Sequence, residues 1–569
     1  MTWIKISGVA FTVLMISLAF LLFLSEGHFY ITTKILPRAT VWSLYISTAL
    51  ISIGLAYHWR ITLSPIIQSK PITRLALLLI LIFSTVFLKN YVPQTNRVYF
   101  DEHIYENIGQ LIHTTGESLM VNQGTIRQGK LFAQAREYNK QPGGYPTYLS
   151  YFFSIFNVSE ATAFFAVNCA YFFTILLIFC VYYLLFQSEL GALYSALFFS
   201  LTPMVMRFAN TAAVEIPTVL FSTLTIYCAL IYRQLPSWFS GASLIGSLGF
   251  TFQMRGESPL MLIPVLLILY PALKTELKIN RFYILLPALT VLLLPVFLHI
   301  LSFRNHSWGN GTGEKFSLDA FKMNSGMNIP FYFTNVRFPI FFTICALFGL
   351  FFRAKKNKIE LLSVWTWFIL TFGIFLFFYA GGYNYGIDVR YSVISAPALA
   401  ILSGFGANRI IEVLTQNFKA IIKVAPLAML ILIVSTWATT LEEVTLLGQE
   451  AVQARLDVSF SREVASKISK DALIFSHNPS MWLILGVSSA QSSILSHLLD
   501  QPLILRNQIR VWRKNYPGGI FFHWNFWCNT MDKVQVTFCQ KIINGFKHKK
   551  VFEQVLNNKP YSVYEILDY

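Results

Sequence analysis

Charged residues are scarce in this sequence. Asp, Glu, Lys and Arg make up 12% of its 569 residues, whereas 55% are hydrophobic and the mean hydropathy is +0.55. Soluble domains carry about 25% charged residues, so this composition excludes an ordinary soluble globular protein. Apolar runs long enough to cross a bilayer recur along most of the chain, which indicates a polytopic membrane protein.

Other absences narrow the class further. The net charge is +17, but no soluble segment carries a basic stripe with interleaved aromatic residues, so nucleic acid is not the expected partner. The sequence has no Gly-rich phosphate loop of the kind that binds nucleotides. The first apolar run, residues 9–24, lacks a small-residue cleavage site, so we interpret it as a retained span rather than a signal peptide.

Cysteine is also rare, with six residues in the chain. Four of them lie inside apolar runs, where we expect packing roles: Cys169, Cys180, Cys228 and Cys345. No CxxC motif or His/Cys cluster points to a structural zinc site. The other two, Cys528 and Cys539, lie close together in the polar C-terminal region. In an oxidising compartment we expect them to form a disulfide.

The apolar runs predict about thirteen transmembrane helices, several of them shorter than the roughly 20 residues of a full crossing. They cover residues 9–24, 41–57, 75–88, 161–186, 191–206, 213–232, 239–252, 259–270, 282–301, 338–352, 361–379, 391–406 and 420–438. We therefore predict a transmembrane domain over residues 1–438.

The distribution of Lys and Arg among the short loops predicts the orientation. The strongest basic clusters, such as the run over residues 353–358, fall on one side if the N-terminus is cytoplasmic. A cell-membrane protein in that orientation has three long extracytoplasmic segments, at residues 89–142, 304–337 and 439–569. Loops of this length usually carry function or structure of their own.

The C-terminal region, residues 439–569, has the pattern of a small α/β domain. Residues 471–476 resemble a buried strand and are followed by the breakers Asn478 and Pro479. A Pro-Gly-Gly turn at 517–519 precedes a second strand at 520–522.

The pair Asp101-Glu102 is the first candidate for chemistry, because it follows an apolar run and so lies near the membrane surface. Mutual repulsion and partial desolvation raise the proton affinity of adjacent carboxylates, which suits a general base or a cation ligand. The alternative is a solvated helix N-terminus, where acids meet the helix dipole favourably.

The residues after this pair predict an amphipathic helix on the membrane surface. Glu102, Tyr105, Glu106 and Gly109 share one helical face. Ile104, Ile108, Leu111 and Ile112 form its apolar flank.

Further charged residues are predicted to gather at the same membrane face. Lys140 lies in a Gly/Pro turn with Tyr145, a second turn carries Arg255 and Glu257, and Asp388, Arg390 and Tyr391 precede a late span. Glu215, near the start of another span, is a weaker candidate. A fixed cation there could hold a phosphate. The alternatives are a snorkelling Lys140 and an Arg255–Glu257 pair that joins two helices.

Charges at one face, rather than at the middle of the bilayer, favour a membrane enzyme that handles an anionic lipid. A transporter would place charges on broken helices at mid-membrane. A lipid or glycolipid flippase remains the alternative, because it accounts for the spans although not for the Asp-Glu pair.

The order of these motifs resembles the GT-C superfamily of polytopic glycosyltransferases, most closely the protein O-mannosyltransferase and lipid A aminoarabinose transferase branch. Asp101-Glu102 with Tyr105 and Gly116 resembles the Asp-Glu signature of the first outer loop. Lys140 and Pro142 resemble the Lys-Pro-Pro segment of the family.

Two later motifs extend this resemblance, which spans about residues 75–405. Residues 249–256 resemble the Thr-Lys-Gly turn, with Arg255 where Lys is usual. Arg390-Tyr391 with Pro397 resembles the Arg-Tyr entry to a late span. The chain departs from the family in two extra N-terminal spans and in a C-terminal domain without a match.

The resemblance implies transfer of a hexosyl or pentosyl group from a polyprenyl-phosphate donor to an extracytoplasmic lipid, glycan or protein acceptor. Asp101 would be the catalytic base, and Glu102 would orient either Asp101 or the acceptor. Lys140, Arg255 and Arg390 would hold the donor phosphate. No cofactor is required by these residues. A divalent metal is the alternative, but the sequence argues against it, because Asn139 stands where some family members carry a metal-ligating acid.

Overall fold

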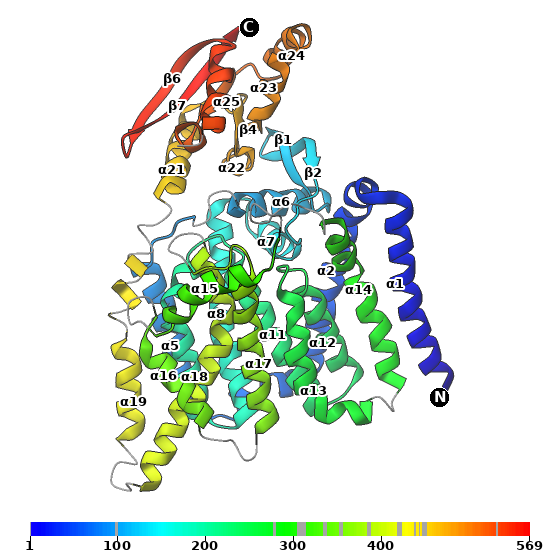
Figure 1. Ribbon diagram of the computed structural model, residues 1–569, viewed down its shortest axis with the longest axis vertical. Coiled ribbons are helices and arrows are strands. Elements are labelled where there is room, and N and C mark those ends of the chain that lie inside the picture. The colour runs from blue at the N-terminus through cyan, green and yellow to red at the C-terminus, as the bar shows by residue number, and fades with distance from the viewer. Residues whose placement is uncertain are drawn as a thin grey trace.

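The computed structural model consists of a bundle of helices with a small α/β domain at one end (Figure 1). It describes residues 2–96, 101–276, 280–303, 314–333, 338–351, 357–383, 388–417, 424–436, 438, 440–442, 444–445, 452–530 and 533–568.

The bundle is built from apolar helices. They are α1 (Thr2–Tyr30), η1 (Ile31–Ile35), α2 (Leu36–Tyr57), α3 (Trp59–Thr62), α4 (Ser64–Ile67), α5 (Pro71–Tyr91), α8 (Glu160–Phe186), α9 (Glu189–Ser200), α10 (Pro203–Ala209), α11 (Glu215–Gln234), α12 (Trp238–Thr251), η2 (Ser258–Met261), α13 (Leu262–Glu276), α14 (Asn280–Phe303), α15 (Leu318–Phe331), α16 (Ile340–Phe351), α17 (Lys358–Phe377), η3 (Asp388–Arg390), α18 (Tyr391–Asn417) and α19 (Ala425–Ser435). Each apolar run predicted from the sequence coincides with one or two of them.

Within the described ranges, eight helical stretches are long and apolar enough to cross a membrane, or nine if the bent pair α9 and α10 counts as one span. The prediction of about thirteen is higher because several helices are short: α12 has 14 residues, α13 has 15 and α16 has 12. The first stretch, Ile4–Tyr57, contains Gly27 at φ 73°, and the chain turns back between α1 and α2 (Figure 1).

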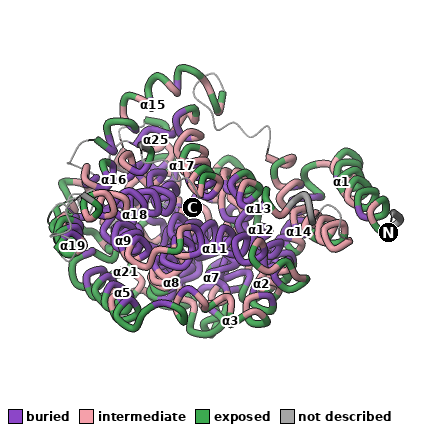
Figure 2. Tube along the Cα trace, turned by 90° about the horizontal axis from the view of Figure 1, so that it is seen from below, coloured by how far each residue is buried: buried purple, intermediate pink, exposed green. Residues whose placement is uncertain are grey.

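Burial follows the position of each helix in the bundle. Figure 2 shows buried residues gathered in central helices such as α9, α11 and α18, whereas α1 at the edge is mostly exposed. The exposed side chains of α1 are apolar, among them Val13, Leu14 and Leu21. Apolar residues on an outer helix face fit contact with lipid.

A layer of shorter elements covers one end of the bundle: α6 (Asp101–Thr115), β1 (Met120–Arg127), β2 (Lys130–Glu137) and α7 (Gly144–Ile155). A helix follows Asp101 as expected, α6, with its two acids in the first turn. The expected solvent-exposed polar face is wrong, because Glu102, His103 and Glu106 are buried. Ile108, Leu111 and Ile112 are buried. α6 lies across the bundle, between it and the α/β domain (Figure 1).

The α/β domain confirms both strands predicted in the C-terminal region, as β3 and β5. Its elements are α21 (Val452–Lys467), β3 (Leu473–Ser476), α22 (Pro479–Ile484), β4 (Ser488–Gln491), α23 (Ser492–Leu499), α24 (Pro502–Asn515), β5 (Ile520–Trp524), η5 (Phe526–Asn529), α25 (Lys533–Asn544), β6 (Lys547–Leu556) and β7 (Lys559–Asp568).

One sheet joins this domain to the layer at the end of the bundle. Its seven strands have the order β2-β1-β4-β3-β5-β7-β6. β3 runs parallel to β4 and β5, whereas β1 pairs antiparallel with β4 through Gln123–Ala490 and Gly124–Ser489. The hairpin of β1 and β2 was not predicted, and it makes the sheet a product of two distant parts of the chain.

Both faces of the sheet are covered. Leu473 and Phe475 pack with Trp512 of α24 on one face. Ile474, between them in sequence, packs with Trp482 of α22 on the other face. This alternation follows from the pleat of a strand, and it explains why the strand is apolar throughout.

Candidate active site

The predicted site residues meet in one cavity of about 480 Å³ at the end of the bundle beneath α6. It is lined by Asp101, Tyr105, Lys140, Gln141, Arg255, Gly256, Glu257, His299, Ile300, Phe303, Lys315, Phe316, Ile374, Phe375, Phe378, Arg390 and Tyr391. Its charged residues come from segments far apart in sequence. The structure therefore brings together the turns and helix ends that the sequence singled out.

Each charged side chain is held at the end of an element. Asp101 is the first residue of α6, and Arg390 is the last of η3, directly before α18. Arg255 lies in the turn between α12 and η2, and Lys140 follows β2. Positions of this kind point side chains into a cavity while rigid helices fix the backbone.

Glu215 organises the arginines from below. Its carboxylate is 1% exposed, and Oε1 lies 2.7 Å from Arg255 Nη1 and 3.8 Å from Arg390 Nε. Arg390 Nη1 also pairs with Asp101 Oδ2 at 3.1 Å, and Arg255 pairs with Glu257. A buried carboxylate that binds two guanidinium groups holds both in fixed positions. Glu215, a weak candidate from sequence, is thus part of the site.

Tyr391 supports the same two arginines. Its ring centroid lies 5.5 Å from the Arg255 guanidinium carbon and 5.2 Å from that of Arg390. On its other side the ring stacks on Phe375 of α17 at 4.3 Å. Cation–π contacts of this kind are worth about 2 kcal/mol when desolvated. The arrangement keeps two positive charges close together in a largely buried place.

Lys140 approaches the arginines because its turn is tied to the Arg255 turn. The backbone N–H of Gly144 donates to the carbonyl of Gln253 at 2.7 Å. Half-burial lowers the pKa of Lys140 below its ordinary value, although the charges of Asp101 and Glu137 oppose this shift. A partly desolvated ammonium group that lines the same cavity as two guanidinium groups is suited to bind an anion.

Some predicted residues lie away from the cavity. Glu102 is completely buried and does not line it. Tyr145 is also buried, and its hydroxyl donates to the carbonyl of Ala212 at 2.6 Å. The side chain of Asp388 lies outside the described residues. Asn139 accepts a hydrogen bond from the Gln141 N–H and is not a lining residue.

Other lining residues were missed by the sequence analysis. Lys315 adds a fourth cation, and His299 comes from α14. Most of the remainder form an apolar wall from α14, α17 and the segment before α15: Ile300, Phe303, Phe316, Ile374, Phe375 and Phe378. All of these except Phe316 belong to long apolar runs or lie beside them, so nothing in the sequence distinguishes them from residues that face lipid.

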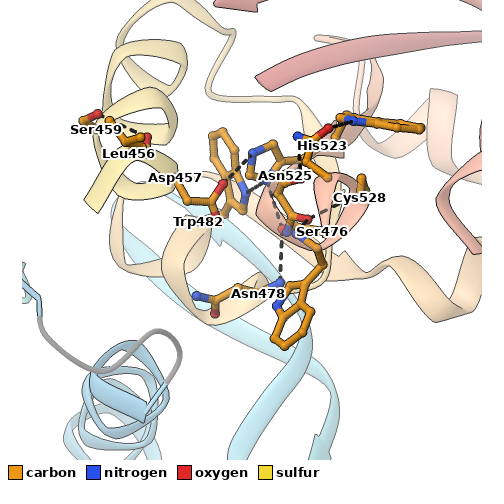
Figure 3. A network of polar contacts seen from close by, with 12 residues as sticks. Leu456, Asp457, Ser459, Ser476, Asn478, Trp482, His523, Asn525 and Cys528 are labelled. Carbon is orange, nitrogen blue, oxygen red and sulfur yellow. Dashed lines mark hydrogen bonds and ion pairs between the residues drawn. The ribbon is translucent and has the colours of Figure 1, made fainter. Parts of the chain in front are cut away.

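A second polar cluster lies in the α/β domain (Figure 3). Ser476 Oγ is 3.2 Å from His523 Nδ1, and His523 Nε2 is 3.4 Å from Asp457 Oδ1. The order matches a Ser-His-Asp hydrolase triad. However, all three side chains are buried, and the indole N–H of Trp482 donates to the same Nδ1 at 3.3 Å. Ser476 has no exposed surface that a substrate could reach. We therefore assign the cluster a structural role, in which its hydrogen bonds link α21, β3 and β5.

The predicted disulfide between Cys528 and Cys539 is confirmed, with a Cα–Cα distance of 5.6 Å. It links η5 to α25 in the core of the α/β domain. His477 lies close enough to both sulfur atoms to complete a metal-binding group. Sulfur atoms joined in a disulfide are not thiolate ligands, so the bond takes precedence over that arrangement.

Residues 140–301 match the family model described as dolichyl-phosphate-mannose-protein mannosyltransferase. No curated protein matches the chain significantly in sequence. The matched segment contains Lys140, Glu215, Arg255 and His299. It includes about half of the polar residues that line the cavity, whereas Asp101, Lys315 and Arg390 lie outside it.

Two solved structures of ArnT share the fold of this chain. ArnT from Cupriavidus metallidurans bound to undecaprenyl phosphate is 14% identical, with a TM-score of 0.53 over 86% of this chain and 97% of that one. Its apo form is 15% identical, with a TM-score of 0.50 over the same shares. The apo oligosaccharyltransferase of Archaeoglobus fulgidus is 10% identical, with a TM-score of 0.47 over 85% of this chain and 74% of that one. The family match and the ArnT fold confirm the GT-C resemblance and a multi-span membrane protein.

Proposed function

We propose that this chain is a membrane glycosyltransferase that moves a sugar from a polyprenyl-phosphate donor to a hydroxyl group of an extracytoplasmic acceptor. The observation that carries the proposal is the single cavity in which Asp101 faces a group of cations beside an apolar wall. A lipid phosphate has the same two parts, a charged head and an apolar tail.

The cations fit the leaving group of such a reaction. Lys140, Lys315, Arg255 and Arg390 line the cavity together with two carboxylates, Asp101 and Glu257. When the bond from the sugar to the donor breaks, negative charge develops on the phosphate. Fixed guanidinium and ammonium groups in a poorly hydrated site stabilise that charge strongly. The buried Glu215 prepares the two arginines for this role by holding them in place before the donor binds.

The apolar wall fits the first isoprenoid units of the donor. Phe303, Phe316 and Phe378 supply much of its surface, and their neighbours belong to the membrane-spanning helices α14 and α17. Burying apolar surface there stabilises binding by about 25 cal/mol per Å². ArnT from Cupriavidus metallidurans, which shares the fold, has been solved with undecaprenyl phosphate bound. This supports the assignment of the donor class.

Asp101 is the base in this scheme. The acceptor O–H gives its proton to the carboxylate, and its oxygen forms a bond to the anomeric carbon. The bond from that carbon to the phosphate oxygen breaks, and its electron pair leaves with the polyprenyl phosphate. Arg390 binds Asp101 through Oδ2. A carboxylate held through one oxygen offers the other to the acceptor.

A single displacement is the expected course. A covalent glycosyl intermediate needs a second carboxylate as nucleophile. Among the described residues, Glu257 is the other acid that lines the cavity and Glu215 lies beside it, and both are paired with Arg255. We therefore expect transfer with inversion at the anomeric carbon, which the NMR coupling constants of the product would report.

The decisive experiment uses the purified full-length protein in nanodiscs with radiolabelled polyprenyl-phosphate sugars, including mannose and aminoarabinose. Extracts of envelope lipids and glycans supply the acceptor. We expect release of polyprenyl phosphate and incorporation of label into the acceptor fraction. Asp319→Asn, in an acid whose side chain is 93% exposed, serves as the active control, and Asp101→Asn as the inactive variant.

The alternative, a flippase, gives a different result in the same material. A flippase moves the intact labelled donor between leaflets in proteoliposomes and leaves its glycosidic bond in place. Transfer of label without translocation supports the enzyme. Translocation of intact donor that persists in Asp101→Asn would overturn the proposal.

A further inference from the structure

A second cluster of potential ligands lies behind α6, away from the donor cavity. His103 and Glu106 are one turn apart on α6, and Glu160 begins α8. One ligand atom from each of the three lies within 4.8 Å of those of the other two, and none of the three lines the donor cavity. His103 Nε2 is 3.3 Å from Glu160 Oε1.

Glu106 is the unusual member of this cluster. It has no exposed surface, and neither of its carboxylate oxygens has a hydrogen-bond partner among the described residues. Burial raises its pKa well above the ordinary value, and the neighbouring carboxylates of Glu160 and Glu102 raise it further. A buried carboxylate without hydrogen bonds destabilises the fold unless a proton or a cation neutralises its charge.

Asn96 completes the group. Its Nδ2 lies 3.0 Å from His103 Nε2 and 3.2 Å from Glu160 Oε1, while its Oδ1 is buried without a partner among the described residues. The nitrogen thus occupies the point where the lone pairs of the histidine and the carboxylate converge. A half-turn of the amide exchanges the two atoms and gives a buried oxygen that faces the same point.

We propose that His103 Nε2, Glu106, Glu160 and Asn96 Oδ1 bind one divalent cation of the zinc type, which fastens α6 to the start of α8. The spacing of the ligands fits. A tetrahedral ion with bonds of about 2.1 Å separates its ligand atoms by about 3.4 Å. One imidazole with carboxylate and amide oxygens suits Zn²⁺ or Mn²⁺ better than copper, which favours softer or nitrogen-rich sites.

Groups around the cluster support the ligands. Arg462 of α21 donates from Nε to Glu160 Oε2 at 2.8 Å, so the second oxygen of that carboxylate is fixed and its charge is shared. On the far side of the imidazole, His103 Nδ1 lies 3.5 Å from the amide of Asn478. The oxygen of the same amide accepts from the Met481 N–H and caps α22, so Asn478 fixes the imidazole beside the α/β domain.

The position gives the cation a structural role. α6 begins with Asp101 and belongs to the bundle side, whereas Arg462 and Asn478 belong to the α/β domain. An ion at this junction would hold the catalytic helix, α8 and the domain in one arrangement. The proposal does not depend on the transferred group, because a cation at this place stabilises the fold whatever the reaction is.

The test measures metal binding and stability, and it requires no substrate. Full-length protein without a histidine tag is stripped with EDTA in detergent and titrated with Zn²⁺. We expect one zinc per chain to remain after desalting, measured by inductively coupled plasma mass spectrometry, and a higher Tm in the zinc-bound form. Binding of less than half an equivalent by the wild-type protein would overturn the proposal.

The variant Glu106→Gln distinguishes a site that binds a metal from one in which Glu106 is simply protonated. Glutamine imitates the neutral acid, so this variant should fold, and its zinc affinity should fall by at least about 100-fold. Glu463→Gln on α21, in an acid whose side chain is half exposed, should bind zinc like the wild type. Equal zinc affinity in Glu106→Gln and the wild type would refute the assignment and leave a protonated Glu106. His103→Gln gives an independent measurement if Glu106→Gln fails to fold.

Discussion

Asp101 stands at the start of α6, and its Oδ2 pairs with Arg390. In the proposed reaction the same residue would face the acceptor and contact a group that binds the phosphate. Replacing it with Asn preserves size but removes the ability to accept a proton. We expect kcat to fall by about 10²–10⁴, the usual contribution of a positioned acid–base group. Donor affinity should not weaken, because loss of the carboxylate leaves the cations in place. Turnover near the wild-type value would rule out Asp101 as the base.

Lys140 should show the opposite behaviour. Lys140→Ala removes a charge-assisted contact with the donor phosphate, which should weaken donor binding by about 1.5–3 kcal/mol with a smaller effect on kcat. Since burial lowers the pKa of Lys140, its charge, and with it this part of the affinity, should be lost on alkalinisation before that of an exposed lysine. Binding of a polyprenyl phosphate measured against pH would report this. Lys322→Ala, in an exposed lysine of α15, is the matched control.

At the scale of residues the sequence identified most of the polar site. Asp101, Lys140, Arg255 and Arg390 were singled out because each is a charge next to an apolar run, and all four line one cavity. Glu102 shared that signal but is buried on another side of α6. Adjacent residues on a helix point about 100° apart, and only the packing around α6 decides which of two neighbouring acids faces the cavity.

The contact between the Lys140 turn and the Arg255 turn holds the cations of the cavity in place. A Cβ on Gly144 would approach the carbonyl oxygen of Gln253 to 2.4 Å, so Gly144→Ala must push the Lys140 turn away from the Arg255 turn. Displacing a binding group by about 1 Å can lower kcat/KM by about 10²-fold. Gly326→Ala is the control, because its added Cβ meets nothing within 4 Å. An unchanged kcat/KM in Gly144→Ala would show that this contact does not position Lys140.

The disulfide between Cys528 and Cys539 is expected to stabilise the α/β domain. Replacing Cys528 and Cys539 by serine releases a short loop, which should cost about 2–3 kcal/mol of domain stability. We expect the double variant to be cleaved faster by proteases between β5 and β6 and to unfold at a lower temperature. Cys169→Ser, in a half-buried free cysteine of α8, should leave both unchanged. Equal protease resistance in the double variant and the wild type would contradict this role.

The hairpin of β1 and β2 shows where prediction from sequence ended. Met120–Arg127 alternates poorly, contains Gly124 and carries several polar residues, so it has no strong strand pattern. It becomes a strand because β4, more than 300 residues later, supplies a partner edge. Non-local pairing of this kind leaves little trace in the local sequence, whereas the buried strands β3 and β5 are apolar throughout and were predicted.

At the scale of the whole molecule, α6 and this hairpin connect the cavity that contains Asp101 to the α/β domain. β2 leads into the Lys140 turn, and β1 pairs with β4 of the domain. α22 also packs beneath the sheet against Leu111 of α6. The α/β domain therefore contacts the segment between Asp101 and Lys140 at two places, α6 and the hairpin. The sequence predicted the two parts separately, and only the shared sheet shows that they form one unit.

The shared sheet also shows which segments lie on the same side of the membrane. Backbone hydrogen bonds between β1 and β4 cannot form across a bilayer, so the first long loop and the α/β domain must lie on the same side. The basic clusters of the short loops predict that this side is extracytoplasmic. We expect a membrane-impermeant thiol reagent to label Thr115→Cys and Asn507→Cys in intact cells, in a background in which the four free cysteines are replaced by serine. Thr115 is preferred to Gly116, whose φ of 72° would strain a cysteine.

Gln234→Cys, at the opposite end of the bundle, provides the control and should react only after permeabilisation. The two outcomes that would contradict the expectation have different meanings. Labelling of Thr115→Cys and Asn507→Cys from opposite sides would disprove the seven-stranded sheet. Labelling of both only after permeabilisation would keep the sheet but reverse the orientation, and a donor cavity facing the cytoplasm would then exclude an extracytoplasmic acceptor.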